Sequence, residues 1–159
     1  MHAFKDAAGK DWLVEINVGA IKRVRALVGV DLLALEDGAP PLLTRLGMDV
    51  VLLCDVVFAL IEPQAKAAGV TDEQFGASLG GEAILHAQAA FYQELTGFFR
   101  SLQRPDLIMA IAKQAEMIGL AVRTVEQRLT IIDPAAEVEV IFGAQSTNSP
   151  ESVESAPTP

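Results

Sequence analysis

Apolar positions repeat with a helical period over most of the chain, and most clearly between residues 81 and 102. There the apolar side chains recur at steps of three and four, which places them on one side of an α-helix. Such a stripe is wide enough to face the core of a globular domain. The expected stripe is Ile84, Ala87, Phe91, Leu95, Phe98 and Leu102, widened by Ala83 and Phe99, and the polar side holds Glu82, Gln93, Glu94 and Arg100.

The N-terminal segment follows a period of two instead. Trp12, Val14 and Ile16 occupy every second position, which is typical of a strand with one buried face. Phe4 lies on the expected partner strand, and Gly9 suits the turn because glycine tolerates positive φ. We therefore expect a β-hairpin over residues 3–16. Two strands alone are marginally stable in water, so the hairpin must pack on helices.

Polar caps and a glycine mark the next two helices. Asn17 is expected to cap a helix that runs to about Val28, where Gly29 ends it. Asp49 is expected to cap a second helix, VVLLCDVVFALIE, up to Glu62. Because this run is apolar almost all round, it should be the most buried helix of the protein.

Shorter elements surround that buried helix. Glycine and proline break the pattern before it, leaving a turn of helix at residues 32–35 and another near residues 42–46. Pro63 either kinks the buried helix or starts a new turn. The sequence TDEQ at residues 71–74 is a capping box, so it predicts a short helix over residues 72–79.

The last long helix is expected from Pro105 to about Thr130. The short connection before it makes it antiparallel to the helix at residues 81–102. Its apolar residues alternate three and four over three heptads, as in a coiled coil. Residues beside this seam contact either other helices of the domain, which the pattern favours, or a partner chain. The seam is Ile108, Ile111, Ala115, Ile118, Val122, Val125 and Leu129, and Leu107, Met109, Met117 and Leu120 lie beside it.

The C-terminal part changes character. Residues 135–142 form either a short helix or, through VEVIF, an edge strand. From residue 143 the chain is rich in Ser, Pro and Glu, and it buries too little apolar surface to offset its ordering entropy. The expected architecture is thus one mainly α domain, residues 1–142, a helical bundle with an N-terminal β-hairpin, followed by a disordered tail, residues 143–159.

Composition narrows the classes of function. The 159 residues carry a formal net charge of −9, which disfavours binding to nucleic-acid phosphates. The longest apolar run contains Asp55 and is shorter than the roughly 20 residues that span a bilayer, so we expect no membrane partner. Cys54 is the only cysteine, so an internal disulfide is excluded and a cytoplasmic setting fits. The first twelve residues lack the apolar core of a signal peptide.

Motifs for catalysis are absent from the sequence. There is no glycine-rich phosphate loop, HExxH, GxSxG or CxxC. Cys54, inside an apolar run, is typical of a small core residue rather than a nucleophile. His86 stands alone, which is typical of a surface or boundary histidine. We expect no enzyme activity, no cofactor and no metal site.

One basic cluster stands out on the helix after Asn17. It either forms a patch for an acidic partner or is the solvated face of an amphipathic helix, and three charges over one turn favour the solvated face. It is kept as a candidate interaction site together with apolar residues of the last helix. The candidate partner-binding residues are Lys22, Arg23 and Arg25, with Met109, Met117 and Leu120.

The order of these features resembles a known family. The segments are FKDAAGKDWLVEINVGAIKRVRALVGVDLL, then EPQAKAAGVTDEQFGASLGGEAILHAQAAFYQELTGFF, and finally NSPESVESAPTP. Together they are similar to small tail proteins of long-tailed bacteriophages and prophage-like elements, in particular tail assembly chaperones. The shared patterns concern packing and turns, and none is a catalytic signature.

The resemblance implies a non-enzymatic role in the cytoplasm of a bacterial host. Such chaperones bind the tape-measure protein, keep it soluble, and help the tail-tube protein polymerise around it. A ribosomal frameshift often gives a longer form, to which residues 143–159 would be the linker. The alternatives are a structural tail or connector component and a general helical interaction module. A homo-oligomer is compatible with each.

Overall fold

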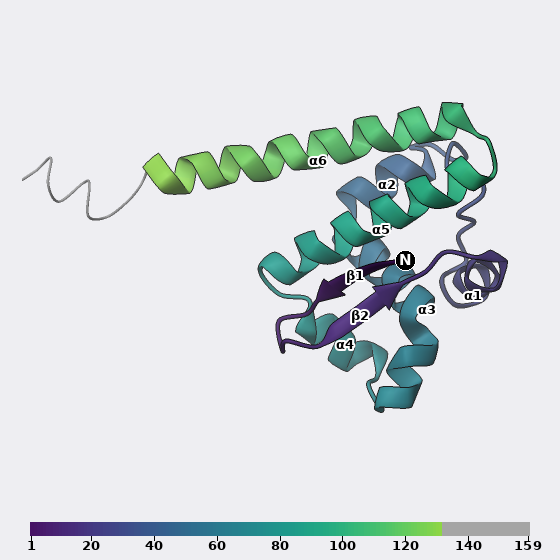
Figure 1. The fold of residues 1–159 in the computed structure, drawn as a ribbon, viewed down its shortest axis with the longest axis horizontal. Helices are drawn as coiled ribbons and strands as arrows, with labels where there is room; N and C mark the ends of the chain where they lie inside the picture. Colours follow the sequence, from purple (N-terminus) through teal and green to yellow (C-terminus); the bar gives the residue numbers. More distant parts are fainter. Residues whose placement is uncertain (132–159) are drawn as a thin grey trace, which may run out of the picture. The chain divides into compact units, whose positions relative to one another are not determined.

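The computed structural model describes residues 1–131, with side chains up to Gly119. Residues 1–118 form one compact unit, and a second unit begins at Gly119. The architecture is mainly helical with an N-terminal antiparallel hairpin, which confirms the expected fold class (Figure 1). The alternatives for residues 135–142 and the tail at 143–159 lie outside the described residues. The elements are β1 (His2–Lys5), β2 (Asp11–Val14), α1 (Val18–Val28), α2 (Leu42–Met48), α3 (Val50–Ala68), α4 (Asp72–Ser78), α5 (Glu82–Ser101) and α6 (Pro105–Ile131).

The hairpin turn is organised by a buried carboxylate, that of Asp6. It accepts hydrogen bonds from the backbone N–H groups of Ala8 and Lys10, both at 2.9 Å, and from Nε1 of Trp12 at 2.8 Å. Gly9 adopts a φ of 85°, as the turn requires. Burial opposes ionisation of Asp6, but the hydrogen bonds outweigh it and lower the pKa of the carboxyl group.

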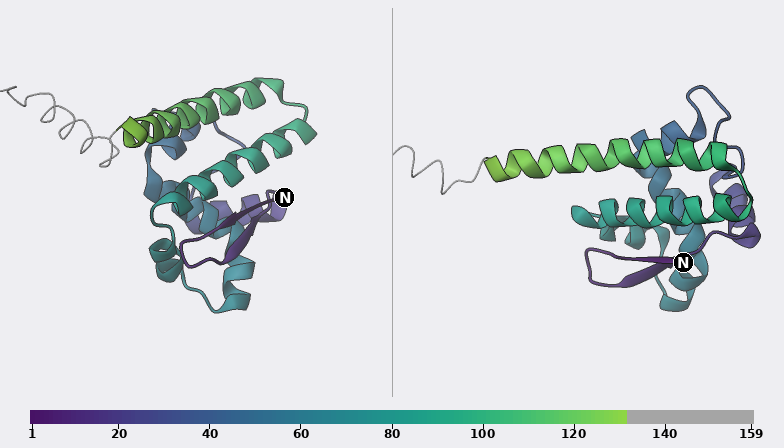
Figure 2. Two further views of the ribbon diagram at one scale, coloured as in Figure 1. Left: turned by 60° about the vertical axis from the view of Figure 1, so that its left-hand side comes forward. Right: turned by 45° about the horizontal axis from the view of Figure 1, so that its top comes forward.

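The hairpin buries its apolar face on helices. In both views of Figure 2 it lies against α5, and Figure 1 shows β1 as the strand nearer to that helix. Phe75 of α4 is fully buried beneath the hairpin. Its ring centroid lies 5.6 Å from that of Trp12 and 6.4 Å from that of Phe4, both edge-on. These aromatic contacts fix the hairpin to the helical part of the unit.

The helix caps expected from the sequence are confirmed. The Asn17 side chain accepts a hydrogen bond from the Ala20 backbone N–H at 2.9 Å, and Gly29 ends α1 in the left-handed conformation. The Asp49 carboxylate caps α3 by accepting two backbone N–H bonds. Both bonds of the capping box between Thr71 and Gln74 are present. Each cap satisfies N–H groups that lack a partner in the first turn of a helix.

Helix α3 continues through Pro63 instead of ending at Glu62. Proline has no N–H, so the carbonyl oxygen of Ala59, four residues earlier, loses its helical partner. Arg23 of α1 replaces that partner. Its Nε donates to the Ala59 oxygen at 3.1 Å, and its Nη2 donates to the Leu60 oxygen at 3.0 Å. A side chain from another helix thus supports the proline within α3.

The prediction that Glu94 lies on the polar side of α5 is wrong. Its carboxylate is largely buried and accepts bonds from Nδ1 of His2 at 2.8 Å and from the Ile16 backbone N–H at 3.3 Å. The N-terminal ammonium lies 2.9 Å from the same carboxylate. Because α5 is covered by the hairpin as well as by helices, its buried arc is wider than one stripe. Leu102 lies beyond the end of α5 and is exposed, contrary to the prediction.

Two further predictions need correction. Residues 32–35 form part of two successive turns rather than a turn of helix, although Leu32 and Leu35 are buried. In α6, Ala115 is exposed and Leu107 is buried, so the inward side is rotated from the predicted seam. The inward side follows Leu107, Ile111, Gln114 and Ile118, which keep the three-and-four spacing but start one residue earlier. Packing against the rest of the unit, rather than the period, therefore fixed the rotation. Val122, Val125 and Leu129 lie outside the described side chains.

Candidate protein-interaction surface

Large apolar side chains reach the surface on α6 and at the junction of α2 with α3. Met109 and Met117 of α6 are 64% and 65% exposed. At the junction, Met48 is 77% exposed, and Val50 and Val51 in the first turn of α3 are also exposed. We call these five residues the apolar surface.

A close contact between α2 and α6 brings the junction beside the part of α6 that carries Met117. A Cβ atom added to Gly47 would lie 2.0 Å from Nε2 of Gln114, so only glycine fits there without displacing that amide. Met48 follows Gly47 directly, and Met117 lies one helical turn beyond Gln114. The junction and this part of α6 are therefore neighbours.

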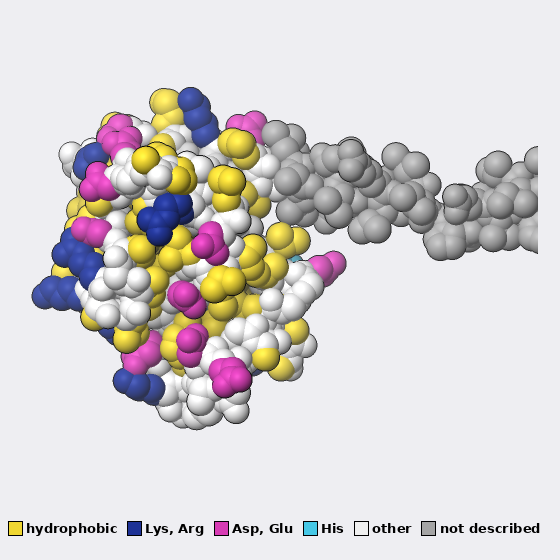
Figure 3. Space-filling model, turned by 180° about the vertical axis from the view of Figure 1, so that it is seen from behind, with side chains coloured by type: hydrophobic (Ala, Val, Ile, Leu, Met, Phe, Trp, Pro, Cys, Tyr) yellow, Lys and Arg dark blue, Asp and Glu magenta, His cyan; other side chains and the backbone are white. Residues whose placement is uncertain are grey.

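The chemistry of the apolar surface suits a protein partner. Methionine is unbranched and polarisable, so it adapts to irregular apolar surfaces. Exposed Lys113 and Glu116 lie between Met109 and Met117 along α6. Figure 3 shows one face on which hydrophobic side chains are interrupted by single acidic and basic side chains. Apolar surface bordered by charge is typical of protein-binding sites.

The residues that the sequence placed beside the α6 seam differ in their exposure. Met109 and Met117 are exposed, as partner-binding residues must be. Leu107 is buried in the core and is therefore not accessible to a partner. The side chain of Leu120 lies outside the described residues. Among the predicted site residues, the two methionines are thus the best candidates on α6.

The basic cluster of α1 is largely engaged within the chain. Arg23 is half-buried and bonds to the carbonyl oxygens of α3. Nη2 of Arg25 lies 2.5 Å from the Asp31 carboxylate, and this hydrogen bond lowers the pKa of Asp31. Lys22 is exposed and forms no ion pair within residues 1–118. The three basic side chains therefore do not form one patch, because Arg23 and Arg25 are bonded within the chain, whereas Lys22 is exposed.

Two titratable side chains of the helical part, Cys54 and Tyr92, have raised pKa values. Burial, reinforced by Asp55 and Asp72, raises the pKa of the Cys54 thiol to about 11, so the thiol stays protonated at neutral pH. Burial raises the pKa of Tyr92 to about 12, and its hydroxyl group has no hydrogen-bond partner in the described part. The described residues contain no group of three or more His, Cys, Asp or Glu side chains placed to hold a metal ion.

Sequence reasoning missed the α2–α3 part of the apolar surface. Val50 and Val51 belong to a run that is apolar almost all round, and this pattern alone indicates burial. The available signal was the cap at Asp49, because the first turn of a helix that starts at the surface is exposed on most sides. The neighbouring exposure of Met48 depends on where α6 packs, which no local pattern shows.

Comparison with known proteins does not assign a family. No protein-family model, curated protein or solved structure matches the chain. Across the residues that the structure describes, no helix combines the length and the hydrophobicity needed to cross a bilayer.

Proposed function

We propose that this chain is a non-enzymatic assembly chaperone of a bacteriophage tail, which binds the tape-measure protein and assists assembly of the tail tube. The observation that carries the proposal is the apolar surface, which leaves Met109 and Met117 uncovered on a unit with a complete core. The resemblance of the chain to tail assembly chaperones supplies the biological context.

The size of the surface fits reversible binding of an apolar helix. Fully burying one large apolar side chain contributes about 2 kcal/mol, so five contribute on the order of 10 kcal/mol before costs. Association itself costs roughly 4 to 15 kcal/mol in lost freedom. The net gain is therefore about 6 kcal/mol at most, a weak affinity that suits a chaperone that must release its client. An amphipathic helix laid on an apolar surface is a common mode of recognition.

The test is co-expression with the protein encoded immediately downstream, followed by recovery of the complex. The full-length chain should keep a long helical partner soluble. The double variant Met109→Gln and Met117→Gln should lose most of that partner while retaining its helical circular dichroism. Leu27→Gln is the matched control, because Leu27 is an exposed apolar residue of α1 outside the apolar surface.

Four outcomes would count against the proposal. Loss of helicity in the double variant would assign both methionines to the core. Presence of the chain in purified phage particles would favour a structural tail or connector component. Equal recovery of the partner by the double variant and by wild type would exclude the apolar surface, and a partner unrelated to phage tails would favour a general interaction module.

A further inference from the structure

The outer edge of β2 is covered by a single side chain, that of Gln64 from α3. The Leu13 N–H donates to Oε1 of Gln64 at 3.0 Å, and Nε2 of Gln64 donates to the Leu13 carbonyl oxygen at 2.6 Å. The amide therefore makes the two bonds that a neighbouring strand would make. Both main-chain groups of Leu13 must point away from β1.

The outer edge of β1 has no such cover. Ala3 is paired with Leu13, and in an antiparallel ladder both members of a non-hydrogen-bonded pair point outward. The Asp6 N–H donates to the Lys10 oxygen at 2.9 Å, so Asp6 faces β2. Because hydrogen-bonded and non-hydrogen-bonded pairs alternate, the main-chain groups of Lys5 point outward, as those of Ala3 do. No hydrogen bond to the main-chain groups of Ala3 or Lys5 is found within residues 1–118.

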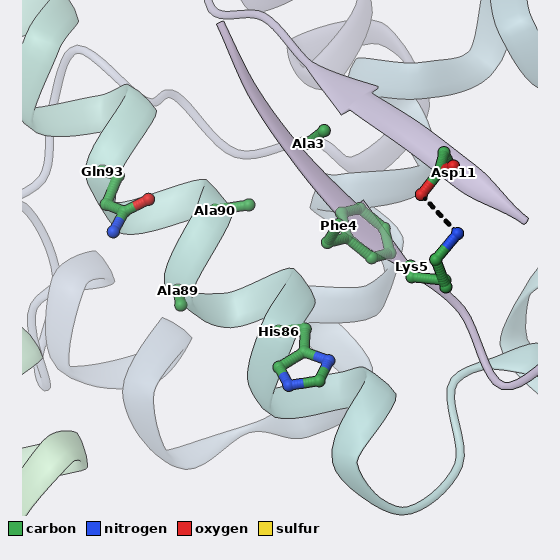
Figure 4. A pocket seen from close by; sticks show the side chains of 8 residues that line it. All are labelled: Ala3, Phe4, Lys5, Asp11, His86, Ala89, Ala90 and Gln93. Carbon is green, nitrogen blue, oxygen red and sulfur yellow. Dashed lines mark ion pairs between the residues drawn. The ribbon is translucent and has the colours of Figure 1, made fainter. Parts of the chain in front are cut away.

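A groove of about 410 Å³ runs beside this edge, between β1 and α5 (Figure 4). Phe4 and Ala90 are buried and form its floor. Exposed Ala89 contributes a small side chain to the helical wall, and His86 and Gln93 lie one turn to either side of the alanines. The groove thus combines an open strand edge, a wall of small side chains and two polar groups.

We propose that this groove binds an extended segment of a partner protein, which adds to β1 as a third strand. Ala3 and Lys5 offer two donors and two acceptors about 7 Å apart, the repeat of every second residue in a strand. Alternate side chains of the segment face the α5 wall, where Ala89 and Ala90 leave room for a small apolar residue. Addition of a peptide strand beside a helix is an established way to bind peptides.

The charged residues of the hairpin do not protect this edge. Lysine on an edge strand commonly discourages strand addition. Here Nζ of Lys5 is held by the Asp11 carboxylate at 2.9 Å and by the Gly9 carbonyl oxygen at 3.2 Å. Both partners belong to the hairpin itself, so the ammonium group is drawn toward β2 and the turn. The inference is independent of the proposed chaperone function, which uses α6 and the α2–α3 junction.

The first experiment measures amide hydrogen exchange by NMR on the full chain without ligand. The Ala3 and Lys5 amides should exchange rapidly, and the Phe4 amide, which points toward β2, should exchange slowly. Slow exchange at Ala3 and Lys5 would overturn the proposal. If that protection were independent of concentration, the chain's own residues would cover the edge; if it grew with concentration, a second copy would.

The second experiment selects binders from a displayed library of random eight-residue peptides. Enriched peptides should be strand-forming and should protect the Ala3 and Lys5 amides when added to the full chain. Ala89→Trp fills the groove and should weaken binding at least about tenfold. Ala3→Pro removes one outward donor without removing a bond to β2, and it should also weaken binding. Ala112→Trp, at an exposed alanine of α6, is the matched control and should have no effect.

Any of three results would refute strand addition at β1. The library could yield no peptide that binds the full chain. The selected peptides could bind Ala89→Trp and Ala3→Pro as tightly as wild type. They could also be helical and perturb α6 instead of β1, which would assign them to the apolar surface. If Ala89→Trp loses its helical circular dichroism, the binding of the peptides to Ala3→Pro is compared with their binding to wild type instead.

Discussion

The hairpin end of the compact unit and its α2–α6 side differ in which side chains are engaged and which are left exposed. Around the hairpin, polar side chains satisfy main-chain groups: Asp6, Gln64 and Glu94 each bond to them. Between α2 and α6, apolar side chains such as Met48 and Met117 are turned outward. The first arrangement completes the fold, because buried main-chain groups need partners. The second buries no apolar surface within the described unit, and this is why we propose it as the partner-binding side.

The strongest test of the hairpin side is Asp6→Asn. The oxygen of the new amide can still accept from the Ala8 and Lys10 N–H groups, but its NH2 group then faces the N–H of Trp12. The buried bond to Trp12 is lost, and two donors repel each other in its place. We expect a loss of about 3 kcal/mol in the free energy of unfolding, measured by urea denaturation. Asp11→Asn is the control, because the Asp11 carboxylate is exposed. Equal stability of both variants would contradict the role of Asp6.

A smaller loss is expected from Arg23→Ala, which leaves the Ala59 carbonyl oxygen without a partner. The cost should be about 2 kcal/mol. Pro63→Ala restores an N–H at position 63 that can bond to that oxygen, so Arg23→Ala should cost less in this background. A double-mutant cycle measures the coupling, expected at about 1 kcal/mol. Additive effects would show that Arg23 does not compensate for the proline.

Acid provides a milder perturbation of the same side. Burial opposes ionisation of Asp6 and Glu94, but hydrogen bonds outweigh it and lower both pKa values below the ordinary 3.8 and 4.5. A lowered folded pKa gives stability that is present above the ordinary value and lost as the pH falls through the folded one. Stability should therefore decrease below about pH 4.5, and Asp6→Asn should make that decrease shallower. Denaturation midpoints measured between pH 3 and 7 test this.

The smallest effect on stability is expected on the α2–α6 side. Met109→Gln and Met117→Gln remove no buried contact, so the free energy of unfolding should change by less than about 0.5 kcal/mol. Recovery of the co-expressed partner should nevertheless fall. A large loss of stability from either substitution would show that the methionines contribute to the fold, as the polar side chains around the hairpin do.

Elements set by neighbouring residues were predictable from the sequence. The caps at Asn17, Asp49 and Thr71 each act within three residues, and the period of two in the hairpin is equally local. The period also placed Met109 and Met117 beside the seam, but it favoured packing against other helices, and their exposure shows that this interpretation was wrong for both. Leu107 shows the limit of that reasoning, since a small rotation of α6 places it in the core.

Features that join distant segments were not predictable. Glu94 looked like a solvent-facing residue of α5, yet it meets Ile16, 78 positions away in the sequence. Leu13 and Gln64 are separated by 51 positions and Arg23 and Ala59 by 36. Periodicity reports only which side of an element is apolar. It contains no information on which unpaired main-chain group another segment will bring within reach.

The sequence by itself determined the helices, their caps, the hairpin and the aliphatic core, because these depend on local conformational preference and hydrophobic period. Only the tertiary structure decided where polar side chains satisfy main-chain groups and which surfaces stay uncovered. The open edge of β1 and the exposed methionines belong to this second class. Both depend on how elements pack, since a surface is left free only when no other part of the described chain covers it.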